Sequence, residues 1–167
     1  MNHSFLRAST VPELLSTYSE IIDELRRRKV LRTANNPAAD YAEFLSCRGL
    51  GLAPAENSEK GYDAFDPEGE NYQIKARRID TGSKPTRFSA IWKFEEGHFR
   101  YLIAVLFSHD FRVYRAFRLS RELVREKAFW QQHVNGWILP VADSIWNDPR
   151  VQDVTAALQR VQLENRG

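Results

Sequence analysis

The stretch GYDAFDPEGENYQIKARR, residues Gly61 to Arg78, has the pattern of a β-hairpin. A short strand around Tyr62 to Asp66 leads into a turn over Pro67 to Glu70, and a second strand with alternating apolar and polar residues follows. The first strand carries acidic side chains. The second carries an amide, an ammonium and two guanidinium groups: Gln73, Lys75, Arg77 and Arg78. Because such groups are costly to gather unless a charged ligand lies between them, the hairpin indicates a site for a divalent cation with a phosphate group behind it.

This hairpin resembles the active-site hairpin of the PD-(D/E)xK nuclease superfamily, which has the restriction-endonuclease-like fold. In the resemblance, Asp63 takes the place of the metal-binding aspartate, and Gln73-Ile74-Lys75 takes the place of the (D/E)xK tripeptide. Two positions depart from the family pattern. No proline precedes Asp63, and Gln73 stands where most members have a carboxylate, although the Mrr-like branch also uses QxK. Glu43, upstream, matches an additional acid that the family often keeps on a helix.

The resemblance implies a metal-dependent endonuclease that hydrolyses DNA phosphodiester bonds, in restriction or genome defence. It implies Mg²⁺ as the cofactor, with Mn²⁺ able to substitute, bound by Asp63, the side-chain oxygen of Gln73 and the backbone carbonyl of Ile74. Lys75 is expected to lie against the attacking water or the phosphate, with Glu43 as a further catalytic acid. A double-strand cut by one small domain needs two such sites, so the active form is expected to be a homodimer.

The sequence offers two candidates for the metal-binding aspartate. If the turn is symmetric about Glu68 and Gly69, Asp66 shares a face with Gln73 and Lys75, which favours Asp66. The family resemblance favours Asp63, and this choice requires a bulge or an odd-length turn between the two strands. Asp66 is also well suited to capping its own turn. We therefore expect Asp63 to be the metal ligand.

The distribution of charge points to a polyanionic partner. The net charge is only +2, but residues 75–125 contain 12 basic and five acidic side chains, a net charge of +7. This basic segment begins at Lys75, inside the hairpin. Phosphate contacts dominate affinity for nucleic acids, so the segment predicts a DNA-binding surface. Its expected members are Arg77, Arg78, Lys84 and Arg87; the alternative is that these residues simply cover the solvent face of a sheet.

A first helix is predicted near the start of the chain. Thr10 and Glu13 have the spacing of a capping box, and apolar residues recur at helical spacing from Val11 to Leu25. This pattern predicts a helix with one buried face. The basic residues that follow, up to Arg32, are interpreted as a solvated helix end and are left outside the site.

A second helix is predicted to begin with Asn36 as its cap and Pro37 in its first turn, and to end at Gly49. Glu43 lies at the border of its apolar stripe. Two interpretations stay open for Glu43. It can lean over a neighbouring site, as the family resemblance implies, or be an ordinary exposed helix residue.

Strands and two more helices are predicted after the hairpin. The segments with strand composition are 89–94, 99–107, 112–119 and 137–142. Tyr101 to Phe107 is apolar on both faces and is predicted to be the central buried strand, whereas the charges of the next segment predict an edge strand. Helices are predicted from Ser120 to about Gln132 and after Asp148.

Together these elements predict one α+β or mixed α/β domain of three layers, in which helices flank a mixed central sheet. The length of 167 residues and the 43% apolar content suit a single domain. We expect an N-terminal helix within residues 1–35, the catalytic core in residues 36–125, and a C-terminal strand and helix in residues 126–167.

Several other kinds of site find no support in the sequence. The four histidines show no spacing typical of zinc ligands, and no glycine-rich phosphate loop is present. A single cysteine, Cys47, cannot form an intramolecular disulfide. The tryptophans, which can stack on bases, are expected to belong to the core: Trp92, Trp130, Trp137 and Trp146. No secretion signal or membrane span is evident, so a cytoplasmic protein without membrane contact is expected.

Two alternatives to an endonuclease remain open. The domain can be a catalytically inactive relative that binds nucleic acid or a protein partner, because Gln73 lacks the charge of the usual metal ligand. It can also be a plain structural hairpin in which Lys75 forms a salt bridge with Asp63.

Overall fold

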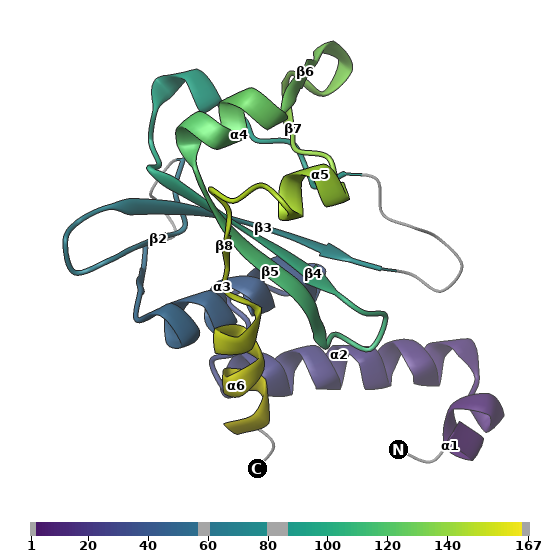
Figure 1. Ribbon diagram of the computed structural model, residues 1–167. Coiled ribbons are helices and arrows are strands. Elements are labelled where there is room, and N and C mark those ends of the chain that lie inside the picture. The colour runs from purple at the N-terminus through teal and green to yellow at the C-terminus, as the bar shows by residue number, and fades with distance from the viewer. Residues whose placement is uncertain (1–2, 57–60, 80–86, 165–167) are drawn as a thin grey trace.

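The computed structural model describes residues 3–56, 61–79 and 87–164, and its described strands form one six-stranded sheet and one two-stranded sheet (Figure 1). The order in the large sheet is β1-β2-β3-β4-β5-β8. Its strands are β1 (Ala53–Pro54), β2 (Ala64–Phe65), β3 (Asn71–Arg78), β4 (Tyr101–Phe107), β5 (Val113–Ser120) and β8 (Gln152–Asp153). Strands β3 and β4 are parallel and the other neighbours are antiparallel. The predicted mixed sheet is therefore confirmed.

Strand β4 is the centre of the sheet, as its sequence predicts. Six of its seven residues are buried, and it lies between β3 and β5. Its alternate side chains enter two separate cores. Ile103, Val105 and Phe107 belong to one hydrophobic cluster, and Leu102, Ala104 and Leu106 belong to the other. A strand that is apolar on both faces thus separates two layers of packing.

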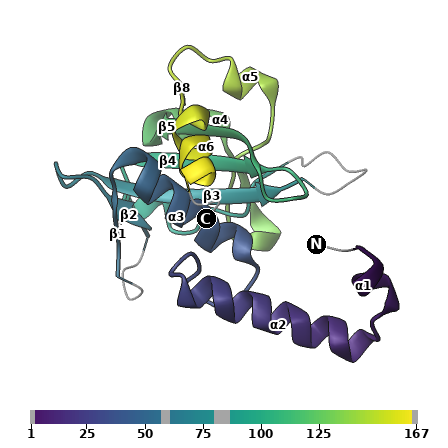
Figure 2. The same ribbon diagram turned by 90° about the horizontal axis from the view of Figure 1, so that it is seen from below.

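Helices cover both faces of the sheet, which confirms the expected layered arrangement (Figures 1 and 2). On one face lie α3 (Pro37–Leu50) and α6 (Thr155–Glu164), whose apolar residues join the first cluster. On the other lie α4 (Arg121–Lys127) and α5 (Asp143–Trp146), which contribute to the second cluster. The two-stranded sheet, made by β6 (Phe129–Gln131) and β7 (Gly136–Ile138), lies on this second side.

The ends of α3 follow from its sequence. The Asn36 side chain accepts a hydrogen bond from the backbone N–H of Ala38 at 3.0 Å, and Pro37 occupies the first helical position. The helix continues to Leu50 and ends at Gly51, which has a positive φ of 69°. The predicted end at Gly49 is therefore wrong by about half a turn, because Gly51 is the residue that adopts the left-handed conformation.

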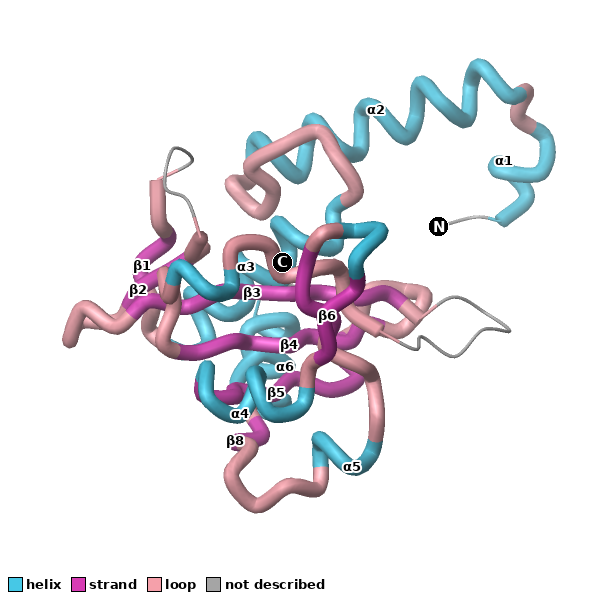
Figure 3. Tube along the Cα trace, turned by 90° about the horizontal axis from the view of Figure 1, so that it is seen from above, coloured by secondary structure: helices cyan, strands magenta, loops and turns pink. Residues whose placement is uncertain are grey.

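The N-terminal region differs from expectation in its burial. It contains α1 (His3–Ala8) and α2 (Val11–Arg27), and the predicted capping box is present, with the Thr10 N–H donating to the Glu13 carboxylate at 2.7 Å. The expected buried face of α2 is wrong. Within this fully described helix only Ile22 is buried, and Val11 is 70% exposed. Figures 2 and 3 show why, because α1 and the first turns of α2 extend away from the sheet.

Segment 89–94 is not a strand. Phe88, Ile91 and Phe94 enter the second core at intervals of three residues, which does not fit the two-residue period of a strand. The chain makes two isolated bridges here, at Arg87 and Ile91, followed by the short 3₁₀ helix η1 (Phe94–Glu96). Tertiary packing of the aromatic residues therefore overrides strand propensity.

The C-terminal third also needs three corrections. Ser120 caps α4 as predicted, through a 3.2 Å bond from the Leu123 N–H, but the helix ends at Lys127 instead of about Gln132. Residues 137–142 do not add a strand to the main sheet; β7 pairs with β6 after the 3₁₀ helix η2 (Gln132–Val134). The last helix begins at Thr155, because Asp148 caps a turn through the Arg150 N–H at 3.0 Å and β8 follows it.

Within the described residues, no helix combines the length and the apolar character that crossing a lipid bilayer requires.

Candidate active site

The β2–β3 hairpin has the odd-length turn that the choice of Asp63 requires. Phe65 pairs with Asn71, and the Asp66 N–H donates to the Glu70 carbonyl at 3.1 Å. Ala64 pairs with Tyr72, and the N–H of Asp63 also donates to the Tyr72 carbonyl, at 2.7 Å. Two consecutive residues of one strand thus meet one residue of the other, as in a β-bulge. The odd-length turn, which sets Ala64 opposite Tyr72, brings Asp63 next to Gln73.

The Asp63 carboxylate is bound by the two residues after Tyr72. Its Oδ2 atom accepts a hydrogen bond from the Ile74 backbone N–H at 2.6 Å and another from the Gln73 side-chain amide at 2.5 Å. Burial raises the pKa of Asp63, and the bond from Ile74 and the charge of Lys75 oppose this effect. The structure therefore brings together the three residues expected to form the metal site: Asp63, Gln73 and Ile74.

Asp66 has a different role. Its carboxylate accepts hydrogen bonds from the backbone N–H groups of Glu68 at 3.1 Å and Glu70 at 2.8 Å, and from the Tyr72 hydroxyl at 3.0 Å. These contacts hold the turn closed, as the sequence suggests for an aspartate before Pro67. Asp66 is thus engaged in local structure, whereas Asp63 faces the pocket.

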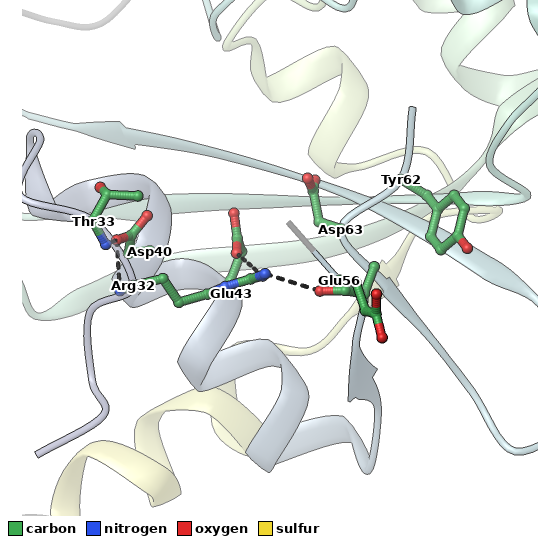
Figure 4. A pocket seen from close by; sticks show the side chains of 8 residues that line it. Arg32, Thr33, Asp40, Glu43, Glu56, Tyr62 and Asp63 are labelled. Atoms are coloured by element: carbon green, nitrogen blue, oxygen red, sulfur yellow. Dashed lines mark hydrogen bonds and ion pairs between the residues drawn. The ribbon is translucent and has the colours of Figure 1, made fainter. Parts of the chain in front are cut away.

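A pocket of about 150 Å³ lies beside Asp63 and is lined by charged residues from α3 and the adjoining loops (Figure 4). Glu43 projects into it from α3, and the Arg32 guanidinium lies 3.3 Å from the Glu43 carboxylate. Arg32 also donates to the backbone carbonyl of Ala55 at 2.9 Å. Of the two interpretations of Glu43, the structure favours the one in which this acid leans over the site.

Glu43 is a weaker acid than an ordinary glutamate. Burial, and next the charge of Asp63, raise its pKa from 4.5 to about 7, although Arg32 opposes the shift. Its side chain is 19% exposed. A carboxyl group that titrates near neutral pH can both accept and donate a proton, which makes it suited to acid–base chemistry.

Lys75 lies on the same face of β3 as Gln73, two residues further along. Burial lowers its pKa, while the charges of Asp63 and Glu43 oppose that change. Its ammonium group lies 5.6 Å from the centre of the Trp92 ring. Asp63 acts on Lys75 through its charge, and no direct ion pair joins these two described residues. The alternative of a structural Lys75–Asp63 salt bridge is therefore not supported.

Two residues of the pocket were not expected from the sequence. Arg32 was interpreted as part of a solvated helix end, but α2 ends at Arg27 and the chain then turns back over the site. Asp40 is 9% exposed and accepts hydrogen bonds from the backbone N–H groups of Arg32 at 2.8 Å and Thr33 at 2.6 Å. The sequence could have indicated Asp40, because it lies three residues before Glu43 on the same helix and such residues share a face.

The expected DNA-binding residues do not all share one face. Arg77 lies on the face of β3 that carries Lys75, whereas Arg78 lies on the other face, with its guanidinium 5.0 Å from the Phe111 ring. Arg87 is exposed and donates to Gln131 at 2.9 Å. Lys84 lies outside the described residues. A basic surface next to Lys75 can therefore include Arg77, and Arg87 is a further exposed cation.

The donor set fits a magnesium ion that keeps several waters. Both hydrogen bonds to Asp63 reach Oδ2, so Oδ1 remains open to another ligand. The Ile74 N–H points to Asp63, and the carbonyl of the same residue lies on the same side of the strand. Within the described residues, no group of three or more His, Cys, Asp or Glu side chains is placed to hold a metal ion. Any such ion would therefore depend on one carboxylate and on neutral oxygens.

Comparison with known proteins gives no relative: no family model matches the chain, and no curated protein matches its sequence.

The raised pKa of Glu43 predicts a specific dependence of stability on pH. Above its ordinary pKa of 4.5 the unfolded chain loses this proton, while the folded protein keeps it up to about pH 7. The free energy of unfolding should therefore fall as the pH rises between these values, by roughly 3 kcal/mol at most from this group. Glu43→Gln should remove this contribution, as measured by urea unfolding in EDTA at pH 5 and pH 8.

Glu56→Gln is the matched control, because Glu56 lines the same pocket but is exposed. It should keep the pH dependence of the wild type. Parallel pH profiles for the wild type and Glu43→Gln would contradict the assignment of the titrating group.

Proposed function

We propose that this protein is a metal-dependent endonuclease that hydrolyses DNA phosphodiester bonds, with a restriction-endonuclease-like fold. The main support is that Asp63 and Glu43 line one pocket, that Gln73 donates a hydrogen bond to Asp63, and that the charges of Asp63 and Glu43 both act on Lys75. The mixed sheet flanked by helices is compatible with that fold. Buried ionisable groups with shifted pKa values are characteristic of sites that bind charged ligands or perform acid–base chemistry.

In this proposal, Asp63, the Gln73 side-chain oxygen and the Ile74 carbonyl hold the metal. Gln73 would have to turn its amide, because its nitrogen now faces Asp63. A bound Mg²⁺ or Mn²⁺ supplies a Lewis acid that favours hydroxide and polarises the phosphate. The orientation of this amide is thus coupled to metal binding.

The remaining residues handle protons and negative charge. Lys75 donates hydrogen bonds to the attacking oxygen or to the phosphate oxygens, where negative charge develops. Glu43 is able to accept a proton near neutral pH, because its pKa is about 7. Arg32 orients Glu43 through their ion pair at 3.3 Å and lies at the wall of the same pocket.

The test is incubation of the purified protein with supercoiled plasmid. Nicking or linearisation with Mg²⁺ or Mn²⁺, and its absence in EDTA, is the expected result. Intact plasmid under all conditions, with a folded protein, would exclude the endonuclease.

A second function is favoured by one observation. At the position where most members of the family have a carboxylate, Gln73 donates a hydrogen bond to the Asp63 carboxylate, as the side chains of an inactive site would. In that case the domain binds nucleic acid or a protein partner without cutting. Salt-sensitive DNA binding without metal-dependent cleavage would select this alternative for nucleic acid.

A dimer belongs to the proposal for double-strand cleavage, since one hairpin attacks one phosphodiester bond at a time. Linear plasmid should then appear only at protein concentrations at which sedimentation detects a homodimer, and the monomer should give nicked circles. Simultaneous cutting of both strands by a monomer would contradict this part of the proposal.

DNA binding should depend steeply on salt. Each phosphate contact contributes about 0.9 to the slope of log affinity against log salt concentration. Arg77→Ala and Arg87→Ala should each reduce the slope by about this amount, measured by fluorescence anisotropy with duplex DNA and without metal.

Arg150→Ala is the control, because Arg150 is paired with Glu126 and Asp148 on another part of the surface. Its slope should equal that of the wild type. A flat salt response of the wild type would remove the phosphate-contact surface from the proposal.

A further inference from the structure

An exposed tryptophan stands next to the proposed catalytic lysine. The Lys75 ammonium lies 5.6 Å from the centre of the Trp92 ring, yet 58% of Trp92 is exposed to solvent. Tryptophan is among the side chains that cores and interfaces normally cover. The sequence-based expectation that all four tryptophans are in the core is therefore wrong for Trp92 and for Trp130, which is 50% exposed. Because Trp92 lies beside the site, its exposed ring is available to a ligand.

The ring of Trp92 is held in a fixed position. Its indole N–H donates to the Val134 carbonyl at 3.1 Å. Its edge packs against Gly136, where an added Cβ would lie 3.2 Å from Trp92 Cδ1 and 3.0 Å from Ala90 Cβ. A side chain at position 136 would thus press against the ring, which would have to move by a few tenths of an ångström. Fixing an aromatic ring before a ligand arrives reduces the entropy cost of stacking on it.

A polar and a basic group are linked to Trp92 through the β6–β7 ribbon. Gln131 is opposite Gly136 in the β6–β7 ribbon, so it shares the face of the ribbon against which Trp92 packs. Arg87 is exposed and donates to Gln131 at 2.9 Å. The Trp92 surface, formed by Trp92, Gln131 and Arg87, therefore combines an exposed aromatic ring near Lys75 with a second cation.

We propose that Trp92 stacks on an unpaired base of single-stranded DNA, next to the phosphate group that Lys75 contacts. An aromatic ring accompanied by cations suits the binding of single strands, because bases stack on the ring while phosphates meet the cations. In a duplex the base faces are already covered by neighbouring bases. The inference rests on the proposed function and makes it narrower: the preferred substrate is DNA with a single-stranded segment at the cut.

The test measures binding without metal, so that it does not depend on cleavage. Labelled oligothymidylate and a duplex of equal length are titrated with the wild type, Trp92→Ala and Trp92→Phe. Trp92→Ala should weaken single-strand binding about tenfold, while duplex binding should change by less than about twofold. Trp92→Phe, which keeps an aromatic face, should lie between the wild type and the alanine variant.

Trp130→Ala is the matched control. Trp130 is also exposed, by 50%, and lies in the same ribbon. It is opposite Trp137 in the register, so its side chain lies on the other face of the ribbon from Gln131. Its replacement should leave the affinity for both DNAs unchanged.

Three outcomes would overturn the inference: no binding of oligothymidylate by the wild type, unchanged affinity in Trp92→Ala, or an equal loss for single strands and duplex. The last would mean that Trp92 acts only by covering Lys75.

If Trp92→Ala does not fold, the inference is tested by the quenching of tryptophan fluorescence by oligothymidylate in the wild type and in Trp92→Phe. The wild type should be quenched more, and equal quenching would contradict stacking at Trp92. Plasmid cleavage tests the proposed function separately.

Discussion

Lys75→Ala should abolish metal-dependent cleavage of plasmid DNA while leaving the protein folded. Removing a group that stabilises developing negative charge typically costs about 10²–10³ in rate, and here it also removes a cation on which the charges of Asp63 and Glu43 act. The fold should survive, because burial already lowers the pKa of Lys75 and disfavours its charged form. Activity is measured from the rate of plasmid nicking in Mg²⁺, and folding from the thermal melting curve.

Arg77→Ala is the control for the lysine. Arg77 lies two residues further along β3, on the same face, but is exposed at the end of the strand. Its loss should weaken DNA binding at moderate salt and leave the cleavage rate at saturating protein close to that of the wild type. Unfolding of Lys75→Ala would show that the lysine has a structural role, and undiminished cleavage would remove it from the mechanism.

Asp63→Asn should reduce cleavage by at least about 10²-fold, whereas Asp66→Asn should retain it. Asparagine keeps an oxygen that can accept the Ile74 N–H bond of 2.6 Å, so the backbone should stay in place while the charge is lost. At position 66, the same oxygen can accept the bonds from the N–H groups of Glu68 and Glu70. Asp66→Asn should therefore cost only about 1 kcal/mol of stability.

The two asparagine variants are compared in the plasmid assay across a range of Mg²⁺ concentrations. A metal ligand should show its loss most clearly at low Mg²⁺. Full activity of Asp63→Asn together with none for Asp66→Asn would show that the turn aspartate, and not the one in the bulge, binds the metal.

The features predicted correctly from the sequence are those with local causes. Alternation identifies β3, a run that is apolar on both faces identifies β4, and Asn36 identifies the start of α3. The irregular pairing at Asp63 was required by the family resemblance, since the symmetric turn preferred by simple pairing gives the other register. The placement of Asp63 next to Gln73 could therefore be stated in advance, but only by choosing between two registers.

The features that were missed depend on contacts between distant parts of the chain. Arg32 reaches the pocket because the loop after α2 turns back, and no local pattern specifies that path. The apolar stripe of α2 indicates a face that is able to be buried, but not whether a partner surface exists for it. The four tryptophans also depend on distant contacts. Trp137 and Trp146 pack into the second core, whereas Trp92 and Trp130 remain exposed.

The parallel pairing of β3 with β4 has a consequence for the order of folding. Strand β2 pairs with only two residues of β3, so the strand that carries Lys75 is held in the sheet mainly by β4, along seven paired positions. The antiparallel pair β4–β5 is joined by a short connection, whereas β3 must close the longer segment 79–100 before it reaches β4. Closing longer loops delays contacts, so β4 and β5 should form the nucleus and the catalytic strand should dock late. Destabilising substitutions on β3 should then accelerate unfolding more than they slow refolding.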